Sequence, residues 1–381
     1  KANNQIKIIM KIAVTTARIL TGLLFIFSGL VKAIDPRGLA YKMEEFFEAW
    51  SNAGFMKGMM ESLSHYSLSF SIIMITLEVV VGVALLIGWQ KKLTTWILLL
   101  LMLFFTFLTS YVLFSGKIRA CGCFGDCIPL TPVQTFTKDI ILLVLVLLLL
   151  FKSKYITPVA KPFFSFLYIL LATLLTLALQ FYVLKHLPLK DCLPYKKGSD
   201  ILKSREMPAD AVQDKFEFVF VYEKDGVKKD FPVSALPDST WKFVERKQTL
   251  IEKGKNNIPL INDFSLTDAD GVDQTDSILS NPAEYYLLFI KEVPDNTEEW
   301  LTAFKKISTS AVVQIKKLYV VTAQRTAVEK FMLKNAISVD KVLTCDATAI
   351  KTAARTNPTL YKMKGAIVQE KWGWADFGKA N

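Results

Sequence analysis

Three cysteines stand close together in the segment SGKIRACGCFGDCIPLTP: Cys121, Cys123 and Cys127. Two cysteines separated by one residue can close only a small, strained disulfide ring, and strain makes a disulfide easier to reduce. Gly122 eases that geometry, and Gly125 lets the loop turn. The spacing therefore fits thiol–disulfide exchange, in which one cysteine attacks and a neighbouring cysteine resolves.

The chain after the cysteine loop predicts the start of a helix. Thr131-Pro132 has the pattern of an N-cap followed by proline at the first helical position. The loop would then run directly into a helix N-terminus, which favours the thiolate form of cysteine. A structural role is an equal alternative, because Cys192 in KDCLPYKKG lies on the same side of the membrane and could pair permanently with Cys127.

A metal site is the weakest interpretation of the cysteine loop. Three close sulfurs and Asp126 lack the paired spacing of a structural zinc site. The chain has two histidines, His65 and His186, and both lie in other segments. We therefore expect no bound metal.

Glu78 is a second candidate for chemistry because it interrupts the apolar run 66–89. It lies about 12 residues, or about 18 Å of helix, from the outer end of that run, at a depth where an unpaired charge is costly. Arg18, the single charge in the run 12–31, is the partner we expect. The pair could serve as a proton relay beside a quinone, or it could be a structural ion pair within the bundle.

Helices that cross a bilayer must position these groups. Hydrophobic residues make up 52% of the 381 residues, and nearly all of the excess lies before residue 185. About 20 apolar residues suffice for one crossing. We expect about five transmembrane helices, at 12–31, 66–89, 93–116, 162–184 and 140–151. The last run is short enough to be re-entrant, and the topology of the chain argues that it crosses.

Basic residues predict the orientation. If five segments cross, residues 1–11, 90–92 and 152–161 share one side and carry basic but no acidic residues, which places that side in the cytoplasm of a bacterial inner membrane. Residues 32–65, the cysteine loop and residues 185–381 then face the periplasm. We interpret the first helix as a retained anchor. Flanking lysines account for much of the net charge of +11, and we expect lipid rather than nucleic acid as a partner.

The segment 36–65 contains MEEFFEAW, in which Phe46, Phe47 and Trp50 have helical spacing beside glutamates. This pattern predicts an amphipathic helix at the membrane interface. The helix could be a substrate lid or a packed connection, and the sequence leaves both open.

The bundle resembles a known family. Arg18 with FSGLVKAIDP, then LEVVVGVALLIGW, then CGCFGD before a long apolar helix is similar to the DoxX and MauE family of redox-associated membrane proteins, over residues 10–155. The resemblance implies a four-helix core and a role in electron transfer or in oxidation of periplasmic partners. It would assign that role to Cys121 and Cys123, with Glu78 as the family's acidic residue in the second helix. This chain adds a fifth span and Cys127.

Beyond the bundle of residues 1–185, the pattern changes. Within residues 216–233, aromatic side chains stand at every second position from Phe216 to Tyr222, and Asp225-Gly226 supplies a tight turn, which predicts a two-stranded ribbon. We expect a short helix over 239–253, so that 186–257 forms a linker with a β-hairpin and a helix. From residue 258 to 381, strands alternate with helices, which predicts an α/β domain.

The α/β domain resembles the TlpA and peroxiredoxin branch of thioredoxin-like proteins through DFSLTDADG and YYLLFI, and Asn357-Pro358-Thr359 fits that family's cis-proline loop. The family's redox pair belongs directly after YYLLFIK, where this chain has EVPDNTEEW and no cysteine. Cys345 is interpreted as inert packing. The groove beside Asn357, Pro358 and Thr359 could bind an extended peptide, or the domain could simply pack on the bundle.

The sequence as a whole favours a redox-associated inner-membrane protein. In this hypothesis Cys121, Cys123 and Cys127 exchange electrons with a partner thiol or a quinone, and the outer domain recruits a periplasmic or membrane protein. The sequence leaves open whether the chain is an enzyme. A quinone is the one cofactor that this hypothesis would involve. The alternative is a non-catalytic membrane subunit that scaffolds a periplasmic or envelope assembly.

Overall fold

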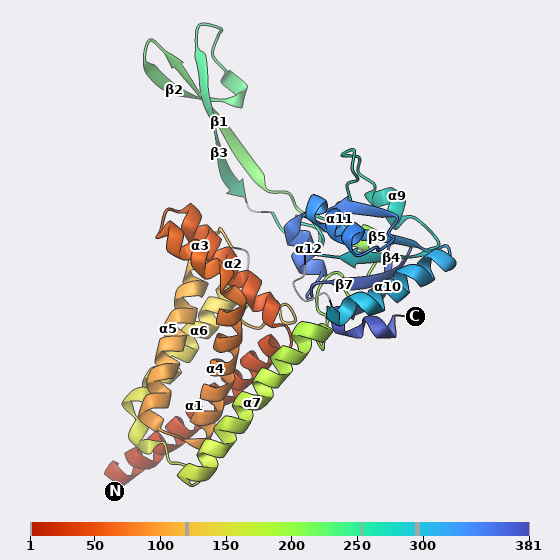
Figure 1. Cartoon of the computed structure of the whole chain (residues 1–381). Coiled ribbons are helices and arrows are strands. Elements are labelled where there is room, and N and C mark those ends of the chain that lie inside the picture. The colour runs from red at the N-terminus through yellow and green to blue at the C-terminus, as the bar shows by residue number, and fades with distance from the viewer. Residues whose placement is uncertain (1, 119–121, 253, 294–297, 381) are drawn as a thin grey trace.

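The computed structural model describes residues 2–118, 122–252, 254–293 and 298–380. A helical bundle, a projecting antiparallel sheet and an α/β domain follow one another along the chain (Figure 1). The α/β domain lies beside the end of the bundle that is opposite the N-terminus. The protein is thus built from a membrane part and a part outside it.

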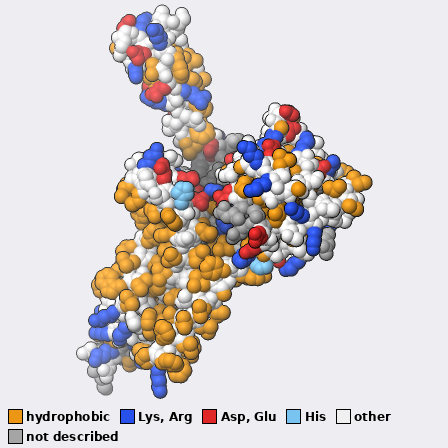
Figure 2. Space-filling model, in the orientation of Figure 1, with side chains coloured by type: hydrophobic (Ala, Val, Ile, Leu, Met, Phe, Trp, Pro, Cys, Tyr) orange, Lys and Arg blue, Asp and Glu red, His pale blue; other side chains and the backbone are white. Residues whose placement is uncertain are grey.

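Among the described residues, five helices of the bundle are long and apolar enough to cross a membrane, so the chain is a multi-pass membrane protein. They are α1 (Ala2–Ala33), α4 (Ser67–Ile87), α5 (Lys91–Ser115), α6 (Pro132–Phe151) and α7 (Pro162–His186). Hydrophobic side chains cover most of the bundle surface in view, and charged side chains gather at its ends and on the outer parts (Figure 2). This distribution is the one that a hydrocarbon solvent requires.

Helix α6 is longer than the apolar run 140–151 from which this span was predicted. Helix α6 begins at Pro132, behind the N-cap Thr131, and a capping box with Gln134 satisfies its first backbone groups. Lys138 and Asp139 end the apolar run in the sequence, yet they lie inside the helix, where their side chains pair at 2.7 Å. Because the two charges compensate each other, the helix continues through them and reaches 20 residues.

Arg18 lies at the bundle end that carries the N-terminus, and the prediction that it pairs with Glu78 is wrong. Its Nε donates to the carbonyl of Leu85 at 2.8 Å, and Nη1 donates to that of Thr157 at 2.9 Å. Nη2 donates to the carbonyl of Leu86. The guanidinium thus satisfies carbonyls at the C-terminus of α4, where a cation is favourable, and ties the α6–α7 connection to that end.

Two shorter helices, α2 (Pro36–Asn52) and α3 (Lys57–His65), lie at the opposite end of the bundle. Helix α2 starts behind Asp35, whose carboxylate accepts from the amide of Gly38 at 3.2 Å, with proline at the first helical position. One face of α2 buries Met43, Phe46 and Phe47 in a cluster with side chains of α4 and α5. The helix is therefore packed on the bundle through its apolar stripe.

The projecting sheet has three strands, β1 (Lys215–Lys224), β2 (Val227–Pro232) and β3 (Lys242–Glu252), in the antiparallel order β2-β1-β3. The predicted helix over 239–253 is wrong, because this segment forms β3. Phe243 packs against Phe220 and Tyr222 of β1, at centroid distances of 6.3 and 5.7 Å. Aromatic cross-strand pairs of this kind stabilise a sheet, and they override the weak helical pattern.

The α/β domain has a five-stranded sheet in the order β6-β5-β4-β7-β8, with β4, β5 and β6 parallel and β7 and β8 antiparallel. Its strands are β4 (Glu284–Phe289), β5 (Lys317–Thr322), β6 (Lys341–Thr344), β7 (Thr359–Lys364) and β8 (Ile367–Gly373). Its helices are α9 (Thr275–Leu279), α10 (Glu298–Val313), α11 (Arg325–Lys334) and α12 (Ala347–Ala353), and α8 (Ile201–Arg205) packs beside them.

Each face of this sheet has its own apolar core. Trp300 and Phe304 of α10 and Val328 of α11 are buried on one face, and Phe264 and Ile350 of α12 are buried on the other. Helices on both faces of a mixed sheet, with two parallel crossovers followed by a terminal hairpin, constitute a thioredoxin-like fold.

The projecting sheet should be separable from the rest of the fold. Val212 and Lys255, at its base, exchange backbone hydrogen bonds of 2.8 and 3.0 Å, so the chain enters and leaves the sheet at one point. Replacing residues 215–252 with a short glycine linker should leave the thermal unfolding temperature of the detergent-solubilised protein within about 2 °C of its original value. A larger fall would show that the sheet stabilises the bundle or the α/β domain.

Candidate functional site

Glu78 is buried where α4 packs beside α1, and its partner is Lys32. Lys32 Nζ lies 2.6 Å from Glu78 Oε2 and 2.8 Å from Oε1. Glu78 is 4% exposed and Lys32 is 3% exposed, so neither charge reaches solvent. A buried ion is tolerated only with a compensating partner. Sequence reasoning missed Lys32, although it is the basic residue in the last turn of the same helix that contains Arg18.

The cysteine loop lies directly over this ion pair. Ser28 Oγ is 2.8 Å from Glu78 Oε1 and 3.1 Å from the carbonyl oxygen of Cys123, so it links the loop backbone to the buried carboxylate. Cys123 is itself buried. Cys121, the other half of the predicted exchange pair, lies outside the described residues.

A second pair of charges borders the loop from α6. Lys138 Nζ lies 4.9 Å from the ring centre of Phe124, and it is close enough to Cys123 and Glu78 to interact with them electrostatically. Its partner Asp139 is buried, and within the described structure Asp139 Oδ2 has no hydrogen-bond partner. Lys32, Glu78 and Lys138 therefore lie at the inner side of the loop near Cys123, and Asp139 pairs with Lys138.

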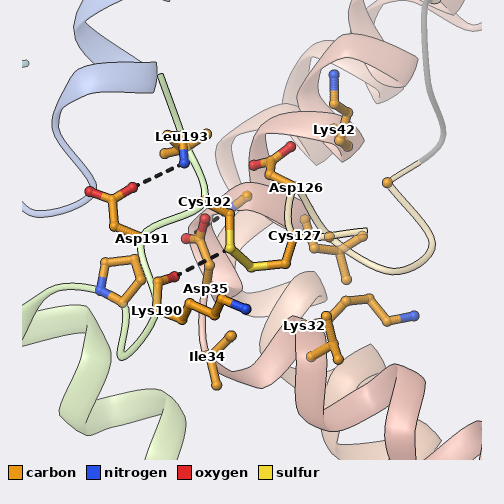
Figure 3. A pocket seen from close by; sticks show the side chains of 16 residues that line it. Lys32, Ile34, Asp35, Lys42, Asp126, Cys127, Lys190, Asp191, Cys192 and Leu193 are labelled. Carbon is orange, nitrogen blue, oxygen red and sulfur yellow. Dashed lines mark hydrogen bonds between the residues drawn. A yellow bond between two sulfur atoms is a disulfide. The ribbon is translucent and has the colours of Figure 1, made fainter. Parts of the chain in front are cut away.

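Cys127 is joined to Cys192 by a disulfide, with 5.0 Å between their Cα atoms. This bond connects the cysteine loop to the segment that leaves α7, and Asp126 and Asp191 stand beside its two halves (Figure 3). The structure thus contains the staple that was one of the two alternatives for Cys127. An exchange pair within the loop is then left to Cys121 and Cys123.

Salt bridges tie both sides of this disulfide to the α/β domain. Arg355 Nη2 lies 2.8 Å from Asp126 Oδ2, and its Nε lies 2.8 Å from Asp35 Oδ2. Lys371 Nζ lies 2.6 Å from Asp191 Oδ2. Because the side chains of Arg355 and Lys371 are each 7% exposed, these bonds are largely shielded from water.

Tyr41 of α2 is the centre of the contact between the bundle and the α/β domain. Its hydroxyl accepts from Lys291 Nζ at 2.8 Å. Lys291, Lys351 and Arg355 lie over its ring at 5.6, 5.4 and 5.4 Å, within the range of cation–π attraction. Burial, reinforced by the positive charges of Arg37 and Arg355, holds the pKa of Lys291 well below its ordinary value.

The cis-proline loop is engaged within the chain. The Asn357-Pro358 bond is cis. Asn357 accepts from the amide of Lys291 at 3.0 Å and donates to the carbonyl of Glu292 at 2.9 Å, so it clamps the chain just after β4. Thr359 is buried and pairs with β4 in the sheet. Since Lys291 and Arg355 both contact α2 or its cap, this face packs on the bundle, and binding of a separate partner by Asn357, Pro358 and Thr359 remains a prediction.

In the part of the chain that the structure describes, no three His, Cys, Asp or Glu side chains are grouped closely enough to hold a metal ion. Cys345 directly follows β6 and is buried in the apolar core that contains Phe264 and Ile350, and burial raises the pKa of its thiol to about 12.

Comparison with known proteins gives the class of the membrane part. Residues 10–152 match the family described as Methylamine utilisation protein MauE, and residues 216–253 match a domain of unknown function, DUF8463. The N-terminal bundle is therefore a MauE-like membrane domain, and it is joined here to a thioredoxin-like domain.

A curated relative is similar to part of the chain. It is Protein TlpB of Flavobacterium psychrophilum, which is 33% identical over 167 residues. The match covers 43% of this chain and 43% of the relative, so the chain spans less than half the length of the curated protein it matches. No solved structure matches the chain.

The buried ion pair generates a prediction about stability. Glu78→Gln preserves the shape of the side chain but leaves the ammonium of Lys32 buried without a counter-charge, which should lower the free energy of unfolding by about 3–5 kcal/mol. The double variant Lys32→Met/Glu78→Gln should recover most of this loss. Glu45→Gln, which breaks the exposed pair with Lys42, is the control and should cost less than about 1 kcal/mol. Wild-type unfolding of Glu78→Gln in denaturant titrations would contradict the assignment.

The raised pKa of Cys345 generates a prediction about reactivity. The pKa of the Cys345 thiol, about 12, is about three pH units above that of an ordinary cysteine. At neutral pH its thiolate fraction should therefore be on the order of a thousandfold lower than that of an ordinary cysteine. Iodoacetamide should therefore leave Cys345 unmodified in the folded protein and modify it after denaturation, as mass spectrometry of its peptide would report. Rapid labelling in the folded state would show that the thiol is accessible.

Proposed function

We propose that this protein carries out thiol–disulfide exchange at the periplasmic face of a bacterial inner membrane, with Cys121 and Cys123 as the reactive pair. The observation that carries the proposal is the position of Cys123 over the buried Lys32–Glu78 pair. Ser28 hydrogen-bonds to both the Cys123 carbonyl and the Glu78 carboxylate. Buried charges within a membrane bundle are costly and mark functional sites. Because these charges lie beneath a cysteine-rich loop, the function that they mark is most simply a reaction of the cysteines.

The charges around the loop suit the needs of exchange. The reactive form of cysteine is the thiolate, which nearby ammonium groups stabilise, and Lys32 and Lys138 both lie at the loop. In the oxidising direction, a thiolate of the partner attacks one sulfur of a Cys121–Cys123 disulfide, and the partner's second thiolate then resolves the mixed disulfide. The partner gains a disulfide and the loop gains two thiols, so two electrons pass to the loop.

The loop must be reoxidised after each exchange, and a quinone is the acceptor we propose. A hollow beside Cys123 is bordered by the apolar side chains of Phe124, Ile128 and Leu130 and by Lys42, a lining that fits an aromatic ring with a polar oxygen. A bound quinone would accept two electrons and two protons. Lys42 would orient its oxygen, and the carboxylates of Glu78 and Asp139 are the buried groups that could hold protons released by the thiols.

The Cys127–Cys192 disulfide is assigned a holding role in this proposal. It fixes the loop to the segment after α7, and the salt bridges of Asp126 and Asp191 connect both of its sides to the α/β domain. The basic residues at the opposite end of the bundle support the orientation in which that end lies in the cytoplasm. The α/β domain and the disulfide then share the oxidising side.

A second candidate function is a non-catalytic membrane subunit that scaffolds an envelope assembly. It is favoured by the missing redox pair after β4 and by the projecting sheet, which exposes Phe243, Val227 and Ile251 among other apolar side chains. Exposed apolar surface of this kind marks sites of protein interaction. The two candidates differ in whether the loop cysteines change their redox state.

The test is a redox titration of the loop cysteines in purified membranes. Differential alkylation and mass spectrometry across a series of glutathione poises should show Cys121 and Cys123 cycling together, at roughly −120 to −200 mV. Cys123→Ser should abolish the transition, and Cys192→Ser should leave a transition of Cys121 and Cys123 in place. Loop cysteines that stay oxidised below about −300 mV, or that never react, would replace this proposal with the scaffold function.

A further inference from the structure

Arg355 joins three segments that are far apart in the sequence. Its guanidinium contacts Asp35 at the start of α2 and Asp126 in the cysteine loop, each at 2.8 Å. Arg355 itself belongs to the loop between α12 and β7, two residues before Asn357. One buried cation therefore holds the cysteine loop, the helix beside it and the cis-proline loop of the thioredoxin-like domain together.

The two carboxylates need this cation between them. A Cβ atom added at Gly38 would lie 2.9 Å from Asp35 Oδ2 and 3.5 Å from Asp126 Oδ2, so both carboxylates border the same residue. Two negative charges beside the same residue repel each other. Without Arg355, Asp126 would be driven away from Asp35, and the loop would move with it because Asp126 lies three residues after Cys123.

The arginine is oriented before it meets the carboxylates. Its Nη1 donates to the carbonyl of Lys351 at 2.9 Å, and its guanidinium lies over Tyr41 at 5.4 Å. A planar fork with five donors can serve two carboxylates and a carbonyl at once, which a lysine ammonium on a flexible stem does less well. The geometry therefore depends on arginine at this position and not on positive charge alone.

We propose that Arg355 is a positioning residue for the cysteine loop, and that the thioredoxin-like domain uses the face around its cis-proline loop to hold Cys123 closed over the Lys32–Glu78 pair. In relation to redox chemistry the inference rests on the proposed function, because only a reactive loop needs to be positioned. Cys123 is buried in a cluster that contains Leu39 and Met43 of α2, so a loop released from Arg355 that moved away from α2 would expose it. The docked domain thus sets the rate at which a partner reaches that thiol.

The experiment measures the alkylation rate of Cys123 in the full-length protein in lipid nanodiscs, with Cys121 and Cys123 reduced and the Cys127–Cys192 disulfide intact, by mass spectrometry of its peptide. Arg355→Gln should raise this rate at least tenfold, and Arg355→Lys should give an intermediate rate. Asp126→Asn leaves the α/β domain unchanged and should also raise the rate. The double variant should react no faster than the faster single variant, because both changes break the same contact.

Two controls separate positioning from general loosening. Arg325→Gln breaks the Arg325–Glu329 pair on α11 and should leave the rate within twofold of the wild type. Thermal unfolding identifies any variant that fails to fold, and Asp126→Asn then decides the question. A rate of Cys123 alkylation in Asp126→Asn or in folded Arg355→Gln that stays within twofold of the wild type would overturn the inference.

The redox titration of the same variants distinguishes this inference from the proposed function. If Cys121 and Cys123 cycle in the wild type and Arg355→Gln changes neither their midpoint potential nor the alkylation rate, the inference fails and the function stands. If the cysteines never cycle but alkylation rises in Arg355→Gln, the proposed function fails and the positioning role stands. A shift of the midpoint potential together with faster alkylation supports both.

Discussion

The ion pair between Lys32 and Glu78 is the interaction on which the outer end of the bundle depends. Hydrocarbon excludes a lone charge, so each of these side chains is tolerated because the other is present. Their contact sets α1 and α4 in one register, and Ser28 extends it to the carbonyl of Cys123. The position of the cysteine loop is therefore specified from below by two charges that the membrane forces together.

The thioredoxin-like domain specifies the loop from the other side. In its family the chain after the first central strand carries the redox pair, but here that position holds Lys291, which bonds to Tyr41 of the bundle. This face carries cations that match the acidic residues of α2 and the loop. It therefore packs against the bundle of the same chain.

The sequence predicts the elements well where the information is local. Apolar run lengths give the number of spans, and Thr131-Pro132 gives the start of α6. The prediction of Arg18 as the partner of Glu78 is wrong because hydropathy does not give the depth of a charge in the membrane. Arg18 donates to carbonyls at the C-terminus of α4, near the basic loops. Lys32 instead pairs with the carboxylate of Glu78. Strand β3 was taken for a helix because none of its side chains is buried, so its pattern carries no strand period.

Contacts between the domains could not be predicted from sequence at all. Arg355 is 229 residues from Asp126 and 320 residues from Asp35, and no spacing rule connects residues so far apart. Its place just before the cis-proline loop was the one available signal, since that loop is where a thioredoxin-like domain meets other proteins. The need for a cation at Arg355 becomes apparent only in the structure, where Asp35 and Asp126 lie opposite it.

The disulfide between Cys127 and Cys192 also has a topological consequence. It spans 65 residues of sequence, and helices α6 and α7 both lie between its ends. Two crossings of the membrane are thus enclosed in one covalent ring, closed on the side where the α/β domain lies. A protease that cut the connection at residues 152–161 on the opposite side would open the ring but release nothing, because the severed halves would still be joined through sulfur.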